Sequence, residues 1–268
     1  MSAPANEQET KARVLRVAIL GSGPSGSALA CMLARQGAEV TLFEHGRRPE
    51  LVVGESLVPA VIPMLRRLGI EEEIAAIGLL KPGASFVWSP LDRFSFTFAR
   101  FAPAVPPYAY NVPRPRFDEV LLANAIASGT QVVRTRARVE RASRNTGTEL
   151  RLAAETLTAA SQWGSRQPDL IVDATGRSRL VARMLDIPTQ IGPRDDLAHF
   201  AHFEGFRWEE APGQVVISRL KAGWSWCIPL PDKLSIGIVV GRKDADRLGA
   251  TPEERLKNAI AFPEDRSP

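Results

Sequence analysis

The feature that most constrains the fold is the glycine-rich turn GSGPSG at residues 21–26, together with the segments on either side of it. The run VLRVAILG before it is short, apolar and rich in β-branched residues, which is typical of a strand buried on both faces in a parallel sheet. The segment SALACMLARQG after it predicts a helix that ends at Gly37, and AEVTLFEHG predicts a second strand. Strand, turn, helix and strand form the opening βαβ unit of a doubly wound α/β fold.

The glycines of this turn predict a dinucleotide site. Gly21 permits the tight turn, Gly23 lets the backbone approach a pyrophosphate, and Gly26 lets helix and strand pack closely. The helix N-terminus offers N–H groups and the positive end of its dipole to the phosphates, and Ser25 is a candidate binding residue there. Glu44, at the end of the second strand, is placed to accept hydrogen bonds from ribose hydroxyls. A glycine-rich turn without a ligand is the alternative, which the flanking strand, helix and acid disfavour.

A second motif, DLIVDATGRS at residues 169–178, favours FAD over NAD, which the βαβ unit alone does not distinguish. An apolar strand ending in Asp-Ala-Thr-Gly resembles the second nucleotide-contacting motif of FAD-dependent oxidoreductases of the hydroxybenzoate-hydroxylase type. The resemblance implies that Asp173 and Gly176 lie near the flavin diphosphate and its ribityl chain. An ordinary strand capped by a turn is the alternative for this motif alone.

Three further stretches resemble the flavin-dependent halogenases, within the wider group that includes geranylgeranyl reductases. VGESLVP is similar to that group's turn beside the flavin, so Gly54, Glu55 and Ser56 are candidate cofactor contacts. YNVPRPRFDEVLLANA places Arg114 where the family has an FAD-contacting arginine. GWSWCIPL contains the family's Trp-x-Trp-x-Ile-Pro hallmark. The matches run from about residue 16 to 241, which is most of the chain.

The resemblance implies a role for the two tryptophans of the hallmark. In the family, reduced FAD reacts with dioxygen, chloride or bromide attacks the flavin hydroperoxide, and the hypohalous acid travels to the substrate. Trp224 and Trp226 would form a rigid wall between flavin and substrate pocket, which prevents direct oxygen transfer. With Ile228 they share one face of a strand, because side chains alternate with period two. Plain core is the alternative for such a stripe.

Lys81, in LLKPGASFVW, matches the essential lysine of family halogenases, which precedes a strand with aromatic residues, here Phe86 and Trp88. Burial lowers the pKa of an ammonium group because desolvation disfavours the charged form. Such a lysine can hydrogen-bond hypohalous acid or form a chloramine, and so aim an electrophilic halogen at an electron-rich ring. The alternative is a solvated lysine in a Lys-Pro-Gly turn.

The expected fold class is α/β: a Rossmann-like FAD-binding domain of the GR2 type with an inserted antiparallel β-sheet substrate domain. Residues 1–13 are expected to be a disordered tail. The FAD-binding domain is assigned to 14–80 and 114–186, and the β-rich substrate domain to 81–113 and 187–268.

The chain departs from the family after its last strands. The family's third flavin segment, which helps to bind FAD and the halide, is expected after the sequence AFPEDRSP, where this chain ends. We therefore expect a C-terminally truncated product, or one that works with a second chain. No separate NAD(P)H site is visible, so a flavin reductase is the expected source of reduced FAD.

Composition excludes several other classes. The net charge of +4 is spread along the chain, which argues against a nucleic-acid footprint. No apolar run is long enough to span a bilayer, and the polar N-terminus does not resemble a signal peptide, so no membrane association is expected. Cys31 and Cys227 lie in no ligand cluster, which favours a reduced, cytoplasmic protein without a metal site. We interpret His45, His199 and His202 as surface or core residues.

Three functions follow as hypotheses. The first is an FAD-dependent halogenase of the kind found in antibiotic biosynthesis, acting on an electron-rich phenol, pyrrole or indole, free or tethered to a carrier protein. The second is a flavin monooxygenase or reductase of the same fold, which needs neither halide nor lysine. The third is a truncated FAD-binding protein without turnover.

Overall fold

The computed structural model describes residues 13–46, 51–89, 91–144 and 147–260. By its internal contacts the chain divides into two compact units, each made of two stretches of sequence. The first unit comprises Met1–Arg47 and Leu121–Pro188, and the second comprises Arg48–Val120 and Thr189–Pro268. The assignment of an FAD-binding part to 14–80 and 114–186 concerns cofactor binding, and it stays a prediction.

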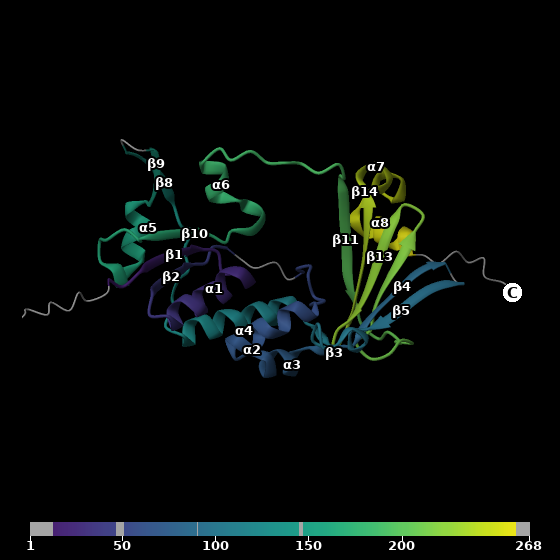
Figure 1. Cartoon of the computed structure of the whole chain (residues 1–268). Coiled ribbons are helices and arrows are strands. Elements are labelled where there is room, and N and C mark those ends of the chain that lie inside the picture. Colours follow the sequence, from purple (N-terminus) through teal and green to yellow (C-terminus); the bar gives the residue numbers. More distant parts are fainter. Residues whose placement is uncertain (1–12, 47–50, 90, 145–146, 261–268) are drawn as a thin grey trace, which may run out of the picture. The chain divides into compact units, whose positions relative to one another are not determined.

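A four-stranded parallel sheet in the order β10-β1-β2-β7 forms the centre of the first unit (Figure 1). The expected βαβ unit is confirmed: the central strand β1 is fully buried along its length, and the glycine-rich turn connects it to α1. Residues Leu20 and Asp173 are register partners, so β1 and β10 end at the same edge of the sheet. The elements are β1 (Arg16–Leu20), α1 (Pro24–Arg35), β2 (Glu39–Phe43), β7 (Gln131–Val133) and β10 (Leu170–Asp173).

A hairpin and several short helices complete the first unit. The sequence segments QVVRTRARVERAS (131–143) and TELRLAAE (148–155) predict the two strands of a hairpin, but β7 joins the parallel sheet and only the later residues of the first segment pair in the hairpin. Trp163 is fully buried in the core cluster beside Leu20 and Phe43. The elements are α4 (Arg114–Ala127, in this unit from Leu121 onward), β8 (Val139–Arg144), β9 (Gly147–Leu152), α5 (Ala154–Ala159), η3 (Ser161–Trp163), η4 (Gly176–Ser178) and α6 (Leu180–Met184).

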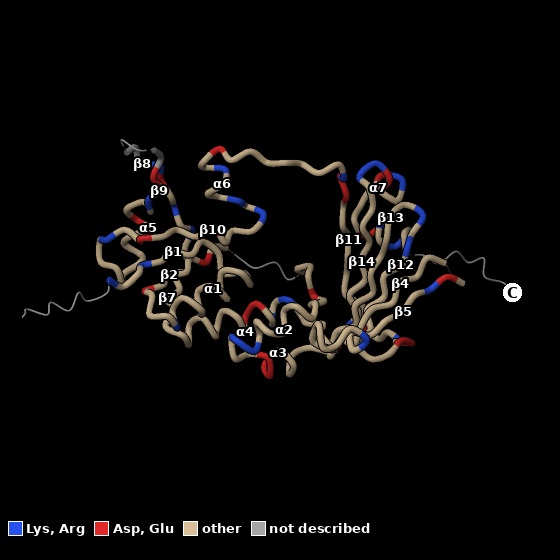
Figure 2. The backbone as a smooth tube through the Cα atoms, in the orientation of Figure 1, with Lys and Arg blue, Asp and Glu red and all other residues tan. Residues whose placement is uncertain are grey.

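A six-stranded sheet in the order β11-β14-β13-β12-β4-β5 forms the second unit. We expected an antiparallel sheet; four of its strand pairs are antiparallel, whereas β12 and β4 pair in parallel, so the sheet is mixed. Figure 2 shows few charged residues along these strands, with charge gathered near α7 and at strand ends. The elements are β4 (Gly83–Ser89), β5 (Asp92–Thr97), β11 (Asp196–Phe203), β12 (Val215–Leu220), β13 (Gly223–Pro229) and β14 (Leu234–Gly241).

The two faces of this sheet differ. One face packs on the last two helices, where Ile238 and Val240 of β14 meet Leu256. The sequence TPEERLKNAI predicts a last helix with Thr251 as its N-cap, and Thr251 Oγ1 indeed accepts a hydrogen bond from the Glu254 N–H at 3.1 Å. We did not expect a separate helix before it. The two helices are α7 (Arg242–Leu248) and α8 (Pro252–Ile260).

The opposite face carries an aromatic row. Strand registers place Phe200 of β11 beside Trp226 of β13 across β14, and Phe86 of β4 beside Phe94 of β5. The ring centroids of Phe200 and Trp226 lie 6.0 Å apart. This face therefore displays aromatic surface, whereas the helix-covered face is aliphatic.

A second, smaller pairing in the same unit holds the segment before the sheet. The two-stranded pair of β3 (Leu79–Lys81) and β6 (Ala109–Asn111) is extended on the other edge of β6 by an isolated bridge from Ser56 to Asn111. The apolar spacing from Leu57 to Ile77 predicts a helical region broken near Gly69. The structure confirms it, and Gly69 adopts the left-handed conformation that ends the first helix. The elements there are η1 (Pro59–Val61), α2 (Ile62–Leu68), α3 (Glu71–Ile77) and η2 (Phe98–Phe101).

Candidate functional site

The glycine-rich turn has the backbone geometry that a diphosphate site requires. Gly21 has φ +115°, and a Cβ there would lie 2.3 Å from the Ala174 carbonyl oxygen. A Cβ on Gly26 would lie 2.0 Å from the Gly21 oxygen, so the first and third glycines are needed for packing. A Cβ on Gly23 would meet nothing within 4 Å. The turn is therefore tight where it packs and open where a ligand would approach, and Ser25 is exposed there.

The predicted ribose acid is held in place by its neighbours. Ser22 Oγ donates a hydrogen bond to Glu44 Oε1 at 3.1 Å. The Arg134 guanidinium lies 3.6 Å from the other carboxylate oxygen, and its side chain is 81% exposed. Sequence reasoning missed Arg134, which follows β7 directly; the sign was the basic segment after residue 133. These contacts keep the Glu44 carboxylate at the end of β2.

The second motif packs directly on the first. Asp173 ends β10, and its carboxylate accepts hydrogen bonds from the Thr175 N–H at 3.0 Å and the Val181 N–H at 2.8 Å. Burial alone would raise the pKa of Asp173, but hydrogen bonds from the Thr175 hydroxyl and from these N–H groups outweigh it and hold the pKa below its ordinary value. Gly176 has φ +57° and open space at its Cβ position. Asp173 thus organises the turn that contains Gly176; a contact of either residue with FAD stays a prediction.

In the second unit, the turn at residues 53–57 is held by side chains from distant segments. The Arg114 guanidinium donates to the carbonyl oxygen of Val53 and pairs with Asp118 at 3.2 Å. Gly54 has φ +95°, and a Cβ there would lie 2.6 Å from the Arg114 guanidinium. Arg114 therefore packs against the turn, and a side chain at position 54 would be strained at this positive φ and would displace the guanidinium.

Glu55 of the same turn is 2% exposed, and its Oε1 lies 2.6 Å from Nε2 of His202 on β11. We interpreted His202 from the sequence as a surface or core residue, and it is the partner of a buried carboxylate. A buried carboxylate requires such a partner because its desolvation is costly. His199, three residues earlier, lies on the helix-covered face, where burial and the nearby Arg255 charge lower its pKa.

Lys81 is buried, with 6% of its surface exposed, so the alternative of a solvated turn lysine does not hold. Its Nζ donates to the carbonyl oxygen of Leu57 at 3.0 Å and lies 5.3 Å from the centre of the Phe98 ring. Burial lowers the pKa of Lys81 to about 8. Phe86 and Trp88 follow on β4 with their rings stacked 6.1 Å apart. Lys81 is thus a partly deprotonated amine at mildly alkaline pH.

The two tryptophans stand side by side on the aromatic face, with ring centroids 5.9 Å apart. The indole of Trp226 lies over Gly237, where a Cβ would be only 2.1 Å from it, and its Nε1 donates to Ser235 Oγ at 3.3 Å. Glycine at this register position therefore makes room for the ring. Trp226 also packs partly against a small core, whereas Trp224 is 38% exposed. Trp226 is thus held by its neighbours, whereas Trp224 presents open aromatic surface.

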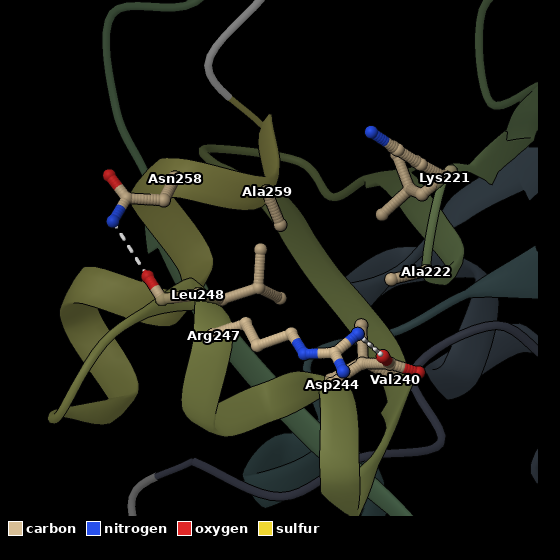
Figure 3. Close-up of a pocket in the computed structure, with 9 residues that line it drawn as sticks. Lys221, Ala222, Val240, Asp244, Arg247, Leu248, Asn258 and Ala259 are labelled. Carbon is tan, nitrogen blue, oxygen red and sulfur yellow. Dashed lines mark hydrogen bonds and ion pairs between the residues drawn. The ribbon is translucent and has the colours of Figure 1, made fainter.

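A cavity of about 500 Å³ lies elsewhere in the second unit (Figure 3). Leu220 and Val240, which line it, lie on the sheet face opposite Trp224 and Trp226, and none of the predicted site residues lines it. The described residues contain no group of three or more His, Cys, Asp or Glu side chains that could hold a metal ion. In the same part of the chain, no helix is long and apolar enough to cross a membrane.

A family model described as "FAD binding domain" matches residues 14–198. The chain is 30% identical over 231 residues to a tryptophan 2-halogenase of Chondromyces crocatus, which covers 84% of this chain and 43% of the relative. It is 28% identical over 235 residues to a 1H-pyrrole-2-carbonyl-[peptidyl-carrier protein] brominase of Pseudoalteromonas luteoviolacea, covering 84% of this chain and 54% of that one.

Among solved structures, the myxobacterial chondrochloren halogenase superposes with a TM-score of 0.72 at 30% identity, covering 90% of this chain and 56% of that chain. The chain thus spans about half the length of the curated relatives it matches.

Proposed function

Since this chain belongs to the flavin-dependent halogenase family of FAD-binding proteins, we propose that it takes part in halogenating an electron-rich aromatic compound. The observation that carries the proposal is Lys81, a buried amine whose pKa is about 8, fixed to the turn that bears Gly54, Glu55 and Ser56. A solvated lysine would be protonated and free to move. Lys81 is desolvated and held in one place, which suits an amine that transfers an electrophilic halogen to a substrate.

In this proposal, each part of the chain has a separate task. The glycine-rich turn and Glu44 bind the adenine-nucleotide half of FAD, and the turn around Gly176 supports the diphosphate. When FAD is bound and reduced, its reaction with dioxygen and a halide would supply the hypohalous acid. Gly54, Glu55, Ser56 and Arg114 would position the cofactor's reactive end.

The remaining residues would act on the product of that chemistry. Lys81 would hydrogen-bond the hypohalous acid or form a chloramine, and so direct the halogen to the aromatic ring. Trp224 and Trp226 would separate cofactor from substrate and exclude water. A separate flavin reductase would deliver reduced FAD. A carrier-tethered substrate is one form to test, because one relative is named as acting on a carrier-bound pyrrole.

The test supplies the protein with reduced FAD, dioxygen, bromide and an activated phenol, and follows the bromine isotope doublet by mass spectrometry. We expect a brominated product that Lys81→Ala abolishes while oxidation of the reduced flavin continues. Lys221→Ala is the matched control, because Lys221 is an exposed lysine of the same unit. Flavin oxidation without brominated product in the wild-type protein would reject the proposal and favour the monooxygenase or reductase hypothesis. Failure to retain FAD would favour the hypothesis of a protein without turnover.

A further inference from the structure

Two buried oxygen atoms of the second unit have no hydrogen-bond partner among the described residues: Ser56 Oγ and Asn111 Oδ1. Leaving a buried polar atom unpaired is destabilising, so such atoms in a folded protein call for an explanation. The orientation of the Asn111 amide is set, because its Nδ2 donates to the Gly213 carbonyl oxygen at 2.9 Å. The unpaired Oδ1 is therefore an acceptor that lacks a donor.

Backbone pairing brings these two side chains together. The Val112 N–H donates to Glu55 O at 2.7 Å, and the Leu57 N–H donates to Tyr110 O at 2.9 Å. These bonds flank the bridge between Ser56 and Asn111, which is thus a non-hydrogen-bonded antiparallel pair whose side chains project to the same side and lie close.

The other edge of β6 adds Lys81 to the same face. Lys81 pairs with Ala109, and alternation along β6 places Ala109 and Asn111 on one side. The side chain between Lys81 and Asn111 on this face is that of Ala109, which is small and fully buried. Lys81 Nζ reaches the carbonyl oxygen of Leu57, the residue next to Ser56. Ammonium, hydroxyl and amide oxygen therefore lie on one face of a short three-stranded patch.

Lys81 also has hydrogen-bonding capacity to spare. An ammonium group carries three N–H donors, and among the described residues its one acceptor is Leu57 O. No described carboxylate forms an ion pair with it, because Glu55 of the turn is bonded to His202 and Asp118 is paired with Arg114. Tyr110 on β6 points to the other side, where it contacts Glu71.

We propose that Lys81, Asn111 and Ser56 bind one small hydroxylic molecule, whose oxygen accepts a hydrogen bond from Lys81 and whose O–H donates to Asn111. Ser56 Oγ can donate to or accept from the same molecule. The Asn111 carbonyl oxygen would repel a bare halide, so the three residues favour a neutral O–H compound over the anion. In turnover this molecule is the hypohalous acid, an assignment that rests on the proposed function; in the FAD-free protein it is water, and the site itself rests on the geometry alone.

The first test needs no cofactor. In the FAD-free full chain, competitive labelling with acetic anhydride across pH, read by peptide mass spectrometry, gives the titration midpoint of Lys81. In Ser56→Ala the hydroxylic molecule is bound less firmly, so the Lys81 ammonium loses a hydrogen-bond acceptor. The titration midpoint of Lys81 should therefore fall by about one pH unit. Thr130→Val is the matched control, because it removes another buried hydroxyl that lacks a partner, in the first unit.

The sign of the shift separates a specific effect from damage to the fold. A variant that merely loosens the second unit would expose Lys81 and raise its midpoint toward that of an ordinary lysine. A lower midpoint in Ser56→Ala, with Thr130→Val unchanged, supports the proposal. An unchanged or raised midpoint in Ser56→Ala overturns it.

The second test distinguishes the hypohalous acid from water. With saturating reduced FAD and bromide, Ser56→Ala should lower the brominated product formed per flavin oxidised by about tenfold, while Thr130→Val matches the wild type. Equal product ratios in Ser56→Ala and wild type would overturn the assignment to hypohalous acid. If the wild-type protein forms no brominated product, the proposed function fails, and the labelling experiment still decides whether the site exists.

Discussion

The glycine-rich turn of the first unit and the 53–57 turn of the second unit achieve their shapes by different means. The first is made by backbone packing: Gly21 and Gly26 have no space for a Cβ, and the contacts come from main-chain atoms. The second is held by side chains, one from each of three distant segments, Arg114, His202 and Lys81. A backbone-built site tolerates no added atom where its glycines pack, whereas a site held by side chains depends on their charge and is sensitive to pH.

The largest expected effect comes from Gly21→Ala. The new Cβ would overlap the Ala174 carbonyl oxygen at a φ of +115°, and strain with overpacking should lower the free energy of unfolding by about 4 kcal/mol. Gly23→Ala is the matched control, because its Cβ meets nothing, so it should leave stability within about 0.5 kcal/mol. Urea denaturation measures both. Equal losses in the two variants would contradict a turn that is tight at one glycine and open at the other.

The second effect concerns pH and Lys81. Its pKa is about 8 in the folded protein against 10.5 for an ordinary lysine, so between these values the unfolded chain binds more protons and stability rises with pH. The contribution of this group should reach about 3 kcal/mol above pH 10.5. Lys81→Met should remove this dependence, which is measured as the difference between the urea-unfolding curves of variant and wild type at pH 7 and pH 10. If the difference in free energy of unfolding between variant and wild type is the same at pH 7 and pH 10, Lys81 is not desolvated.

The third effect is that of His202→Leu. It removes the partner of the Glu55 carboxylate, which is 2% exposed, and should lower the free energy of unfolding at pH 7 by about 3 kcal/mol. Adding Glu55→Gln to this variant should recover part of the loss, because the uncompensated charge is removed. Thermal and urea unfolding of the single and double variants give the coupling energy. If the two losses simply add, the pair does not hold the turn.

The smallest effect is expected for Arg134→Ala. Its guanidinium lies 3.6 Å from Glu44 but is 81% exposed, so the ion pair should contribute less than about 1 kcal/mol to folding. Its removal should still weaken FAD binding more than it weakens folding, because Glu44 loses a neighbour that orients it. Fluorescence titration with FAD measures this, and Arg138→Ala, another exposed arginine of the same unit, is the control. Equal FAD affinities in the two variants would contradict a role for Arg134.

The same contrast explains how much could be predicted from sequence. The first βαβ unit is local: strand, turn, helix and second strand follow one another within residues 16–43, and each was expected. The partner of Glu55 is 147 positions away in sequence, and no local pattern marks His202 as that partner. Asn111 lies within the segment YNVPRPRFDEVLLANA, but the sequence alone does not show that its amide nitrogen donates a hydrogen bond to the Gly213 carbonyl oxygen.

Two differences between the expected and the observed fold also arise because strand partners lie far apart in sequence. Residues 131–133 were expected in a hairpin strand, yet they pair with β2 as the edge strand of the parallel sheet. The parallel pairing of β12 with β4 was not expected either, because alternation along a strand says nothing about which neighbour it will have or in which direction.

That parallel pair has a consequence for synthesis of the chain. The β4–β5 hairpin leaves the ribosome well before β12, its only partner in the rest of the sheet among the described residues, because more than a hundred residues separate them. During that interval the β4 edge of an aromatic-rich hairpin, which β12 later covers, stays open, and an open strand edge is a known template for aggregation. Expression that pauses or stops before residue 220 should therefore yield insoluble material, and a chaperone that shields the nascent hairpin should raise the yield.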